Sequence, residues 1–353
     1  MIKKRFPLIL LLYLCFIHFV FGRKSFEELD KRYESFTQMG GPGFVISILK
    51  NGKTLHQGAF GYANIKKKIK NNFITNFNLA SNSKQFTAGL ALVLEQEGKL
   101  NLNENVSIYI SELKFNGSHI KISDLIHHTS GLPDYMELCH QLKKVKNSDI
   151  LTYVSKKSLL FKPGSKYEYS NTGYVVLSEL LMRVAKKDFR SLISEKIFSP
   201  LKMDTSFIRD ELTERNIHNR ALGYSHWPWF DENDEGPCNY NYGDGAVYTN
   251  INDYAKWLLS LHSDTLFNSS SKQKIFSTYI NESGGIVNYG YGWILDKING
   301  QEAYLHNGSW QGSKSVVAFF PKNKLWIIIL SNYGGIQLSD VLDSYLELFD
   351  YTS

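Results

Sequence analysis

Residues 79–97 read LASNSKQFTAGLALVLEQE, and this stretch is the starting point for interpreting the whole chain. The spacing predicts a helix from Ser81 to Glu97 that is apolar nearly all round, which is typical of a buried helix. Gly98 follows as a helix stop. Residues three apart share one face of a helix, so we expect the Lys84 ammonium to reach the Ser81 hydroxyl.

The Ser-x-x-Lys spacing alone is weak evidence of catalysis. The same pattern also begins at Ser47, Ser111, Ser118, Ser199, Ser269 and Ser271. Ser81 differs because it follows a loop and opens a buried helix, whose N-terminus carries a partial positive charge. A serine hydroxyl becomes a good nucleophile when a neighbour such as Lys84 takes its proton. The alternative is that Ser81 is an ordinary helix N-cap.

A second polar element, Tyr-Ser-Asn at residues 169–171, stands between a proline-glycine turn and a predicted helix over residues 172–187. A phenol titrates near pH 10, but a nearby ammonium favours the phenolate. Tyr169 beside Lys84 is therefore a candidate general base. The amide of Asn171 is a candidate partner for a substrate carbonyl.

The third element is His-Asn-Gly at residues 306–308, near the end of a predicted strand. Gly308 would let a substrate approach the strand backbone closely. The amide of Ser309 could pair with the amide of Ser81 to form an oxyanion hole. His306, Gly308 and Ser309 are therefore candidate substrate-binding residues.

Strand-like segments occur at both ends of the chain, with helical segments between them. An Asn-Gly turn at residues 51–52 predicts a hairpin. The expected strands are residues 44–49, 54–62, 289–298, 301–305, 314–320 and 325–330, and further helices are expected over residues 253–261 and 338–349. We therefore expect an α/β (α+β) fold. One antiparallel sheet from residues 23–80 and 285–353 would be flanked by helices and by an inserted, mainly helical part, residues 81–284.

In this order, the three elements resemble the serine β-lactamase and penicillin-binding-protein superfamily, which carries Ser-x-x-Lys and Lys-Thr-Gly signatures. The resemblance is closest to the class C β-lactamase-like branch, which includes carboxylesterases and D-amino-acid peptidases. It covers nearly all of the chain after the N-terminal segment. The stretches that carry it are residues 79–88 (LASNSKQFTA), 97–100 (EGKL), 128–133 (HTSGLP), 163–164 (PG), 169–174 (YSNTGY) and 290–293 (GYGW).

The resemblance implies a serine hydrolase that forms an acyl-enzyme on Ser81, with Lys84 and Tyr169 sharing the base function and Asn171 binding substrate. His306 departs from the lysine of Lys-Thr-Gly, which supplies a permanent positive charge for a substrate carboxylate. A histidine is mostly neutral at pH 7. We therefore expect an ester or amide of a small molecule or peptide as substrate. The alternatives are a β-lactamase or penicillin-binding D,D-peptidase, and a non-catalytic binder or sensor with the same fold.

Residues 1–22 are expected to be a signal peptide, because a basic start at residues 3–5 precedes an apolar stretch at residues 7–21. That stretch is short for a bilayer span, which needs about 20 residues. We expect a periplasmic or secreted protein, with an uncleaved membrane anchor as the alternative. The net charge is +6, and Lys3, Lys4 and Arg5 supply three of these charges, so the charge gives no case for a nucleic-acid partner.

No cofactor and no metal are expected. After the signal peptide the chain has two cysteines, Cys139 and Cys238, without histidines at ligand spacing. In an oxidising compartment the two could form a disulfide, but the sequence does not report their separation. Pairing and the oligomeric state are therefore left open.

Several other residues could serve the site or simply pack. His127 and His128 are expected in a structural turn. Asp244 stands between two glycines, which is typical of a turn residue, with binding of a substrate amine as the second possibility. Aromatic candidates for a pocket rim are Trp227, Trp229, Tyr242, Tyr248 and Trp310.

Overall fold

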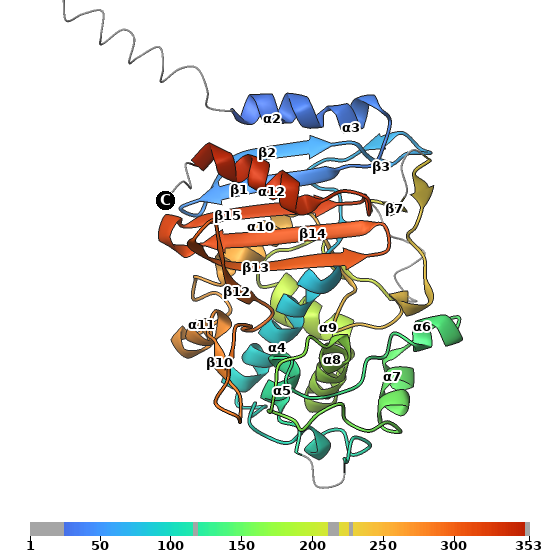
Figure 1. Ribbon diagram of the computed structural model, residues 1–353, viewed down its shortest axis with the longest axis vertical. Coiled ribbons are helices and arrows are strands. Elements are labelled where there is room, and N and C mark those ends of the chain that lie inside the picture. Colours follow the sequence, from blue (N-terminus) through green and yellow to red (C-terminus); the bar gives the residue numbers. More distant parts are fainter. Residues whose placement is uncertain (1–24, 116–118, 211–218, 226–228, 350–353) are drawn as a thin grey trace, which may run out of the picture.

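The computed structural model describes residues 25–115, 119–210, 219–225 and 229–349, so the predicted signal peptide lies outside the described residues. The main element is a six-stranded sheet in the order β12-β13-β14-β15-β1-β2, antiparallel throughout. Its strands are β1 (Phe44–Lys50), β2 (Lys53–Phe60), β12 (Ile294–Ile298), β13 (Gln301–Trp310), β14 (Ser313–Phe320) and β15 (Leu325–Ser331). Strand β1 pairs with β15, so the two ends of the chain share one sheet (Figure 1). The predicted fold class is confirmed.

Helices cover both faces of this sheet. On one face lie α2 (Phe26–Tyr33) and α12 (Leu338–Leu346), and α10 (Ile251–Ser260) lies on the other with the helical part of the chain (Figure 1). The longer helices of that part are α4 (Lys84–Gln96), α7 (Asn147–Val154), α8 (Asn171–Ala185) and α11 (Ser269–Ile275). Shorter helices are α3 (Ser35–Gln38), α5 (Ile122–Ile126), α6 (Leu138–Gln141) and α9 (Phe189–Ile193).

Short helical turns and small sheets complete the structure. The 3₁₀ turns are η1 (Ala80–Ser83), η2 (Val106–Ile108), η4 (Pro237–Asn239), η5 (Pro321–Asn323) and η6 (Glu347–Phe349), and η3 (Ser194–Phe198) is π-helical. A three-stranded sheet joins β5 (Phe77–Asn78), β9 (Val247–Thr249) and β6 (Phe207–Ile208). The two-stranded sheets are β3 (Tyr62–Asn64) with β4 (Ile69–Lys70), β7 (Tyr224–Ser225) with β8 (Asp231–Glu232), and β10 (Tyr279–Ile280) with β11 (Ile286–Val287).

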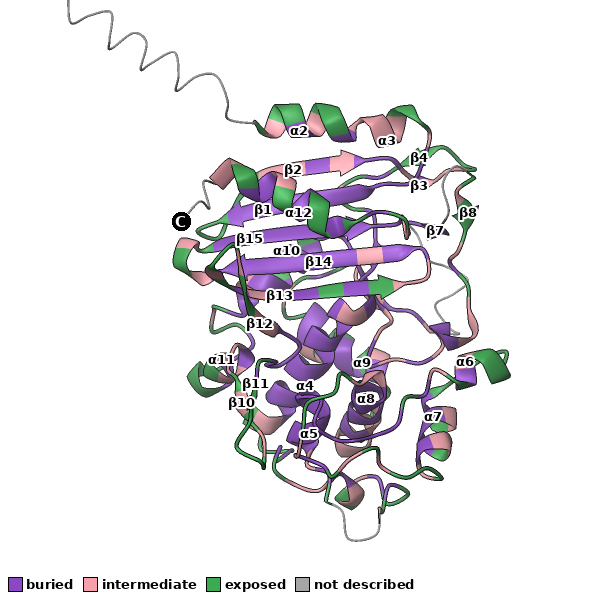
Figure 2. Ribbon diagram, viewed as in Figure 1, coloured by how far each residue is buried: buried purple, intermediate pink, exposed green. Residues whose placement is uncertain are grey.

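The central strands are buried on both faces, which explains their nearly continuous apolar sequences (Figure 2). Successive side chains of a strand point to opposite faces. Phe44 and Ile46 accordingly pack in the core under α2 and α12, whereas Val45 and Leu49 join the larger core around α4 and α8. The sheet therefore holds two apolar layers apart and fixes the start of α4 against its inner face.

Two strand boundaries differ from the prediction for a local reason. The strand expected over residues 289–298 begins at Ile294, because Gly292 has a left-handed backbone (φ +82°) where a Cβ would lie 2.7 Å from Gln85 Cα. The strand expected over residues 301–305 continues to Trp310. The predicted helix over residues 81–97 begins as the 3₁₀ turn η1 before α4.

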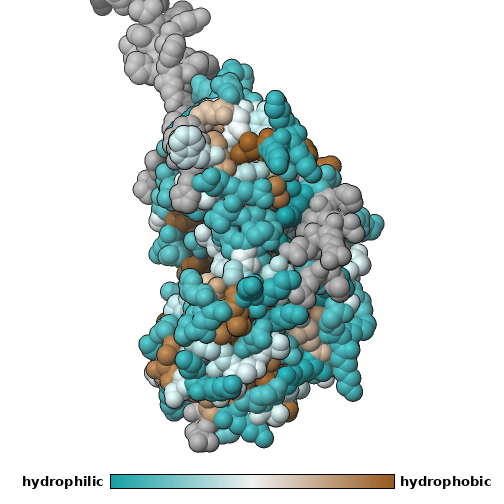
Figure 3. Space-filling model, turned by 90° about the vertical axis from the view of Figure 1, so that its right-hand side faces the viewer, coloured by the Kyte–Doolittle hydropathy of each residue, from teal (hydrophilic) through white to brown (hydrophobic). Residues whose placement is uncertain are grey.

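In the part of the chain that is described, no helix is both long enough and apolar enough to cross a bilayer. Figure 3 shows one face of the molecule, on which hydrophilic side chains predominate and hydrophobic ones form small, separate groups.

Candidate active site

Ser81 lies on a tight turn that its surroundings hold in place. Ala80, just before it, has a left-handed backbone (φ +48°), which is uncommon outside glycine and costs about 1–3 kcal/mol. The Ala80 N–H donates to Asn78 Oδ1 at 2.8 Å, and the Ser315 hydroxyl of β14 donates to the Leu79 carbonyl at 2.6 Å. The sheet thus clamps the turn that presents Ser81.

Lys84 is fully buried and contacts Ser81, as its position one turn along the helix predicts. Its Nζ lies 3.3 Å from Ser81 Oγ, 2.8 Å from Asn171 Oδ1 and 3.1 Å from the Asp244 carbonyl oxygen. The two carbonyl oxygens can only accept hydrogen bonds, whereas a hydroxyl can also donate one. A neutral Lys84 amine can therefore give its two N–H groups to Asn171 and Asp244 and turn its lone pair toward Ser81.

Tyr169 reaches Lys84 through its ring. Lys84 Nζ lies 4.9 Å from the centre of the Tyr169 ring, a cation–π distance, and 39% of the tyrosine is exposed. Across the described residues, no hydrogen bond joins the Tyr169 hydroxyl to Ser81 or Lys84. The phenol is therefore a neighbour of the pair rather than a hydrogen-bonded member of it in this structure.

Two buried histidines lie near the site, and one of them, His128, supports the loop that carries Tyr169. The His128 ring packs against the Tyr169 ring in a tilted arrangement, with 4.3 Å between the ring centres, and its Nδ1 accepts the Ser170 N–H at 3.0 Å. Burial, and then the Lys84 charge, hold the pKa of His128 well below its usual value. His127 Nδ1 bonds to the Tyr289 carbonyl oxygen at 2.8 Å, and burial lowers the pKa of His127 to about 4. Both imidazoles are neutral at pH 7 and serve packing.

His306 is buried behind the cleft. Its Nδ1 donates to the Asn307 carbonyl at 2.6 Å, so its Nε2 accepts the Tyr289 hydroxyl at 2.9 Å. Burial and the nearby Lys84 charge lower the pKa of His306 to about 3. The imidazole is thus uncharged at neutral pH, and it is not among the residues that line the cleft.

The second half of β13 runs past the Ser81 turn with an open edge. Strand β12 pairs with β13 only as far as Leu305, and no strand in the described part of the chain continues this pairing. A Cβ at Gly308 would lie 2.3 Å from the Leu79 carbonyl oxygen, so glycine is required for this close approach. Ser309, the next residue, lines the same cleft as Ser81.

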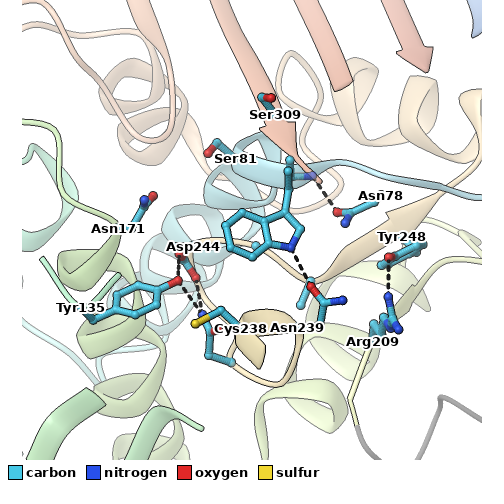
Figure 4. Close-up of a pocket in the computed structure, with 15 residues that line it drawn as sticks. Asn78, Ser81, Tyr135, Asn171, Arg209, Cys238, Asn239, Asp244, Tyr248 and Ser309 are labelled. Carbon is cyan, nitrogen blue, oxygen red and sulfur yellow. Dashed lines mark hydrogen bonds between the residues drawn. The ribbon is translucent and has the colours of Figure 1, made fainter. Parts of the chain in front are cut away.

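A cleft lies in front of Ser81 (Figure 4). In Figure 4, Tyr135 and Asn171 lie toward its left end, and Arg209 and Tyr248 toward its right end. The cleft is lined by Asn78, Ala80, Ser81, Tyr135, Asn171, Arg209, Cys238, Asn239, Asn241, Asp244, Gly245, Ala246, Tyr248, Ser309 and Trp310.

The aromatic rim candidates divide into two groups. Trp310 and Tyr248 line the cleft. Tyr242 instead stacks on Phe189 at 5.2 Å, and Trp229 is 80% exposed, so neither belongs to the cleft lining. Trp227 lies outside the described residues.

Several cleft residues were not anticipated. Tyr135, Arg209 and Asn241 lie in loops, and Asn239 ends the 3₁₀ turn η4, with no motif around them. The Arg209 guanidinium is bound to both carboxylate oxygens of Glu235, at 2.5 and 2.6 Å, so its charge is compensated. Nothing in the sequence marks these residues, because long-range packing brings them to the cleft.

Cys139 and Cys238, whose pairing the sequence did not decide, form a disulfide with 5.5 Å between their Cα atoms. It joins α6 to the turn η4, which lines the cleft. Asn239, next to Cys238, accepts the Trp310 indole N–H through Oδ1 at 2.6 Å. The disulfide therefore stabilises one wall of the cleft.

Comparison with known proteins agrees with this architecture. The family described as Beta-lactamase matches residues 27–349. Penicillin-binding protein 4* of Bacillus subtilis (strain 168) is 30% identical over 332 residues, covering 88% of this chain and 72% of that protein. Protein flp of Staphylococcus aureus (strain N315) is also 30% identical, over 330 residues and 88% of this chain, but the chain spans only 64% of flp.

A solved structure shows the same fold at lower identity. The D-amino acid amidase of Ochrobactrum anthropi SV3, complexed with L-phenylalanine, superposes with a TM-score of 0.75 at 19% identity, covering 92% of this chain and 96% of the amidase. The family match over nearly the whole described chain, together with this fold, leads to one conclusion. The chain belongs to the Beta-lactamase family of serine hydrolases.

Proposed function

We propose that this chain hydrolyses an ester or amide bond of a small molecule or peptide through an acyl-enzyme on Ser81. The observation that carries the proposal is the set of contacts of Lys84. Two of its three partners are acceptors only, and the third is the Ser81 hydroxyl at 3.3 Å. The arrangement supports proton transfer from Ser81 Oγ to a neutral Lys84 amine.

In the proposed reaction, Ser81 Oγ attacks the substrate carbonyl carbon while its proton passes to Lys84 Nζ. The N–H groups of Ser81 and Ser309 would stabilise the oxyanion. Collapse of the tetrahedral intermediate breaks the bond to the leaving group, which takes a proton from Lys84 or through Tyr169. Water then hydrolyses the acyl-enzyme, and its proton returns through the same groups.

The neutral imidazole of His306 supports an acyl group without a carboxylate over one that carries a carboxylate. Its imidazole, with a pKa of about 3, supplies no cation at neutral pH. Arg209, which lines the cleft, is engaged by Glu235. Esters and small amides are therefore favoured over β-lactams and acyl-D-Ala-D-Ala peptides.

The test combines kinetics with intact-protein mass spectrometry. Wild-type protein should hydrolyse p-nitrophenyl acetate and gain the mass of one fluorophosphonate adduct. Ser81→Ala should lose both the turnover and the adduct. Unchanged turnover in Ser81→Ala, with a normally folded protein, would contradict the proposal.

A β-lactamase or penicillin-binding activity is the second candidate, favoured by the similarity to penicillin-binding protein 4*. A chromogenic cephalosporin and a fluorescent penicillin distinguish the cases. Rapid cephalosporin turnover would indicate a β-lactamase, and slow penicillin labelling without turnover a penicillin-binding protein. A stable protein that reacts with none of these reagents would instead support a non-catalytic binder or sensor.

We also propose that the protein is exported, as a periplasmic or secreted enzyme. The basic and apolar residues 1–22 and the Cys139–Cys238 disulfide support this location, because disulfides persist in oxidising compartments. Cell fractionation with N-terminal mass spectrometry tests it. A cytoplasmic protein that retains residue 1 would contradict the proposal.

A further inference from the structure

We propose that Ser315 is a positioning residue for the reaction at Ser81. Its buried hydroxyl, oriented by Asn82, sets the distance between the N–H groups of Ser81 and Ser309. The inference rests on the proposed hydrolase function, in which these two N–H groups stabilise the oxyanion. Ser315 is not among the residues that line the cleft, so it acts through the backbone rather than by touching substrate.

The Ser315 hydroxyl holds both sides of the Ser81 turn. Ser315 lies on β14 and is 1% exposed. Its hydroxyl donates to the Leu79 carbonyl oxygen at 2.6 Å and accepts the Asn82 side-chain N–H at 2.8 Å. Leu79 and Asn82 flank the dipeptide Ala80-Ser81. One hydroxyl therefore fixes the backbone before Ser81 and the side chain after it.

The same hydroxyl lies against the strand that carries Ser309. Gly308 pairs with Ser315 across the β13–β14 ladder, and Ser309 is the next residue. A Cβ at Gly308 would lie 2.5 Å from Ser315 Oγ and 2.3 Å from the Leu79 carbonyl oxygen, so the backbone of β13 lies directly against this hydrogen bond. Ser315 thus links the two segments whose N–H groups would bind the oxyanion.

A chain of side chains behind the turn fixes the direction of these hydrogen bonds. The Trp257 indole can only donate, and it donates to Gln85 Oε1 at 3.2 Å. Gln85 Nε2 then donates to Asn82 Oδ1 at 2.9 Å, which leaves Asn82 Nδ2 to donate to Ser315 Oγ. The Ser315 proton must therefore point to the Leu79 carbonyl oxygen.

Burial makes this chain rigid. Asn82 is 0% exposed, and Gln85 and Trp257 are each 1% exposed. In such a dry environment hydrogen bonds strengthen one another, and a lost partner leaves a buried polar group unsatisfied. The left-handed backbone of Ala80 is strained, so the turn can shift when this restraint is removed. Loss of the Ser315 hydroxyl should therefore move the Ser81 N–H relative to β13.

The first test is the kinetics of Ser315→Ala with p-nitrophenyl acetate. Rates are expressed per active site, counted by complete fluorophosphonate labelling. We expect kcat and kcat/KM to fall about 10-fold each, with KM nearly unchanged, because a misplaced oxyanion donor weakens binding of the transition state alone. Thermal unfolding checks that the variant folds.

Ser331→Ala is the matched control. Ser331 lies on the neighbouring strand β15 and is 0% exposed, and its hydroxyl donates to the Gly43 carbonyl oxygen at 2.7 Å. The substitution removes the same kind of buried hydrogen bond from the same sheet but not from the Ser81 turn. It should keep wild-type kcat even where it lowers the unfolding temperature. Equal kcat in Ser315→Ala and Ser331→Ala would overturn the proposal.

A second readout separates positioning from a purely structural role. Phenylboronic acid forms a tetrahedral adduct with a reactive serine, and one of its oxygens then takes the place of the oxyanion. Its Kd should rise in Ser315→Ala by about the factor by which kcat falls, since both report binding of the tetrahedral state. Ser331→Ala should keep the wild-type Kd. An unchanged Kd in folded Ser315→Ala would also overturn the proposal.

Asn82→Ala tests the same device without altering Ser315. It removes the N–H that orients the hydroxyl, so the Ser315 proton is free to turn away from Leu79. We expect kcat to fall roughly threefold or more, again with little change in KM. This variant decides the matter if Ser315→Ala does not fold, and a wild-type kcat would then refute the assignment.

Failure of this proposal is distinguishable from failure of the hydrolase function. Ser81-dependent hydrolysis of p-nitrophenyl acetate with equal kcat in the Ser315 and Ser331 variants would reject the positioning role alone. Wild-type protein that is folded but shows no Ser81-dependent hydrolysis would reject both.

Discussion

Trp310 donates its indole N–H to Asn239 Oδ1 at 2.6 Å, and this bond ties the end of β13 to the disulfide-bearing turn. Ser309, immediately before Trp310, lines the cleft beside Ser81. The side of the cleft that carries Ser309 and the side that carries the disulfide are therefore connected through one side-chain contact.

Trp310→Phe should weaken substrate binding. The substitution keeps an aromatic ring but removes the N–H that Asn239 accepts, which is worth about 1 kcal/mol. We expect KM for p-nitrophenyl butyrate to rise roughly fivefold, with a smaller change in kcat. Trp229→Phe is the matched control, because Trp229 is 80% exposed and outside the cleft, and its kinetics should equal wild type. An unchanged KM in Trp310→Phe would show that the Trp310–Asn239 hydrogen bond does not affect substrate binding.

Removing the disulfide should destabilise the fold and loosen the same wall. Cys139 and Cys238 are 99 residues apart, and the loop-entropy treatment assigns a bridge of about this length roughly 4–5 kcal/mol. Cys139→Ser with Cys238→Ser should lower the free energy of unfolding in urea by a few kcal/mol and raise KM as Trp310→Phe does. Wild-type protein with and without reductant provides the control. An unfolding curve that is insensitive to both treatments would disprove the prediction.

Gly308→Ala should abolish most activity. A Cβ at this position would meet the Leu79 carbonyl at 2.3 Å, so β13 must move away from the Ser81 turn. A misplacement of about 1 Å can cost about 100-fold in rate. Asn307→Ala is the control on the same strand, since Asn307 is exposed, and should stay within about threefold of wild-type kcat/KM. Comparable activity of the two variants would show that the close approach is unimportant.

His306→Gln should make stability less sensitive to acid. An unfolded histidine takes up a proton near pH 6.5, whereas His306 in the fold does so only at a pKa of about 3. Between these two pH values the unfolded state therefore binds more protons than the folded state. The free energy of unfolding consequently decreases as the pH falls from about 6.5 to about 3. Wild type should lose up to about 1.4 kcal/mol more per pH unit than the variant in this window. Urea unfolding at pH 7.5, 6 and 5 measures how the free energy of unfolding changes with pH in the wild type and in the variant. The same pH dependence in both proteins would contradict the prediction.

The sequence predicted the parts of the site that depend on local spacing. Ser81 and Lys84 lie one helical turn apart, so their contact follows from helix geometry. The Asn-Gly hairpin and the strands at both chain ends follow from turn chemistry and apolar periodicity. These features are determined by local sequence and do not require contacts with distant parts of the chain.

The other parts of the site depend on contacts between residues that are far apart in the sequence, and local residue spacing does not predict such contacts. Tyr135 meets Asn241 and Asp244 across 106 and 109 residues of sequence, and the Cys139–Cys238 bridge spans a similar interval. His306 is recognisable as a departure from a family pattern, but its burial and its bond to Tyr289 appear only in three dimensions. The short sheet of β5, β9 and β6 was likewise missed, because two- or three-residue strands have no periodicity to detect.

The pairing of β1 with β15 has a consequence for how this protein is made. Ser47 faces Ile328 across the sheet, so β1 cannot complete its hydrogen bonds until the ribosome has made β15. Contacts between such distant segments slow folding and leave apolar strand edges exposed meanwhile. A newly synthesised chain therefore exposes an unpaired edge of β1 until β15 has been made.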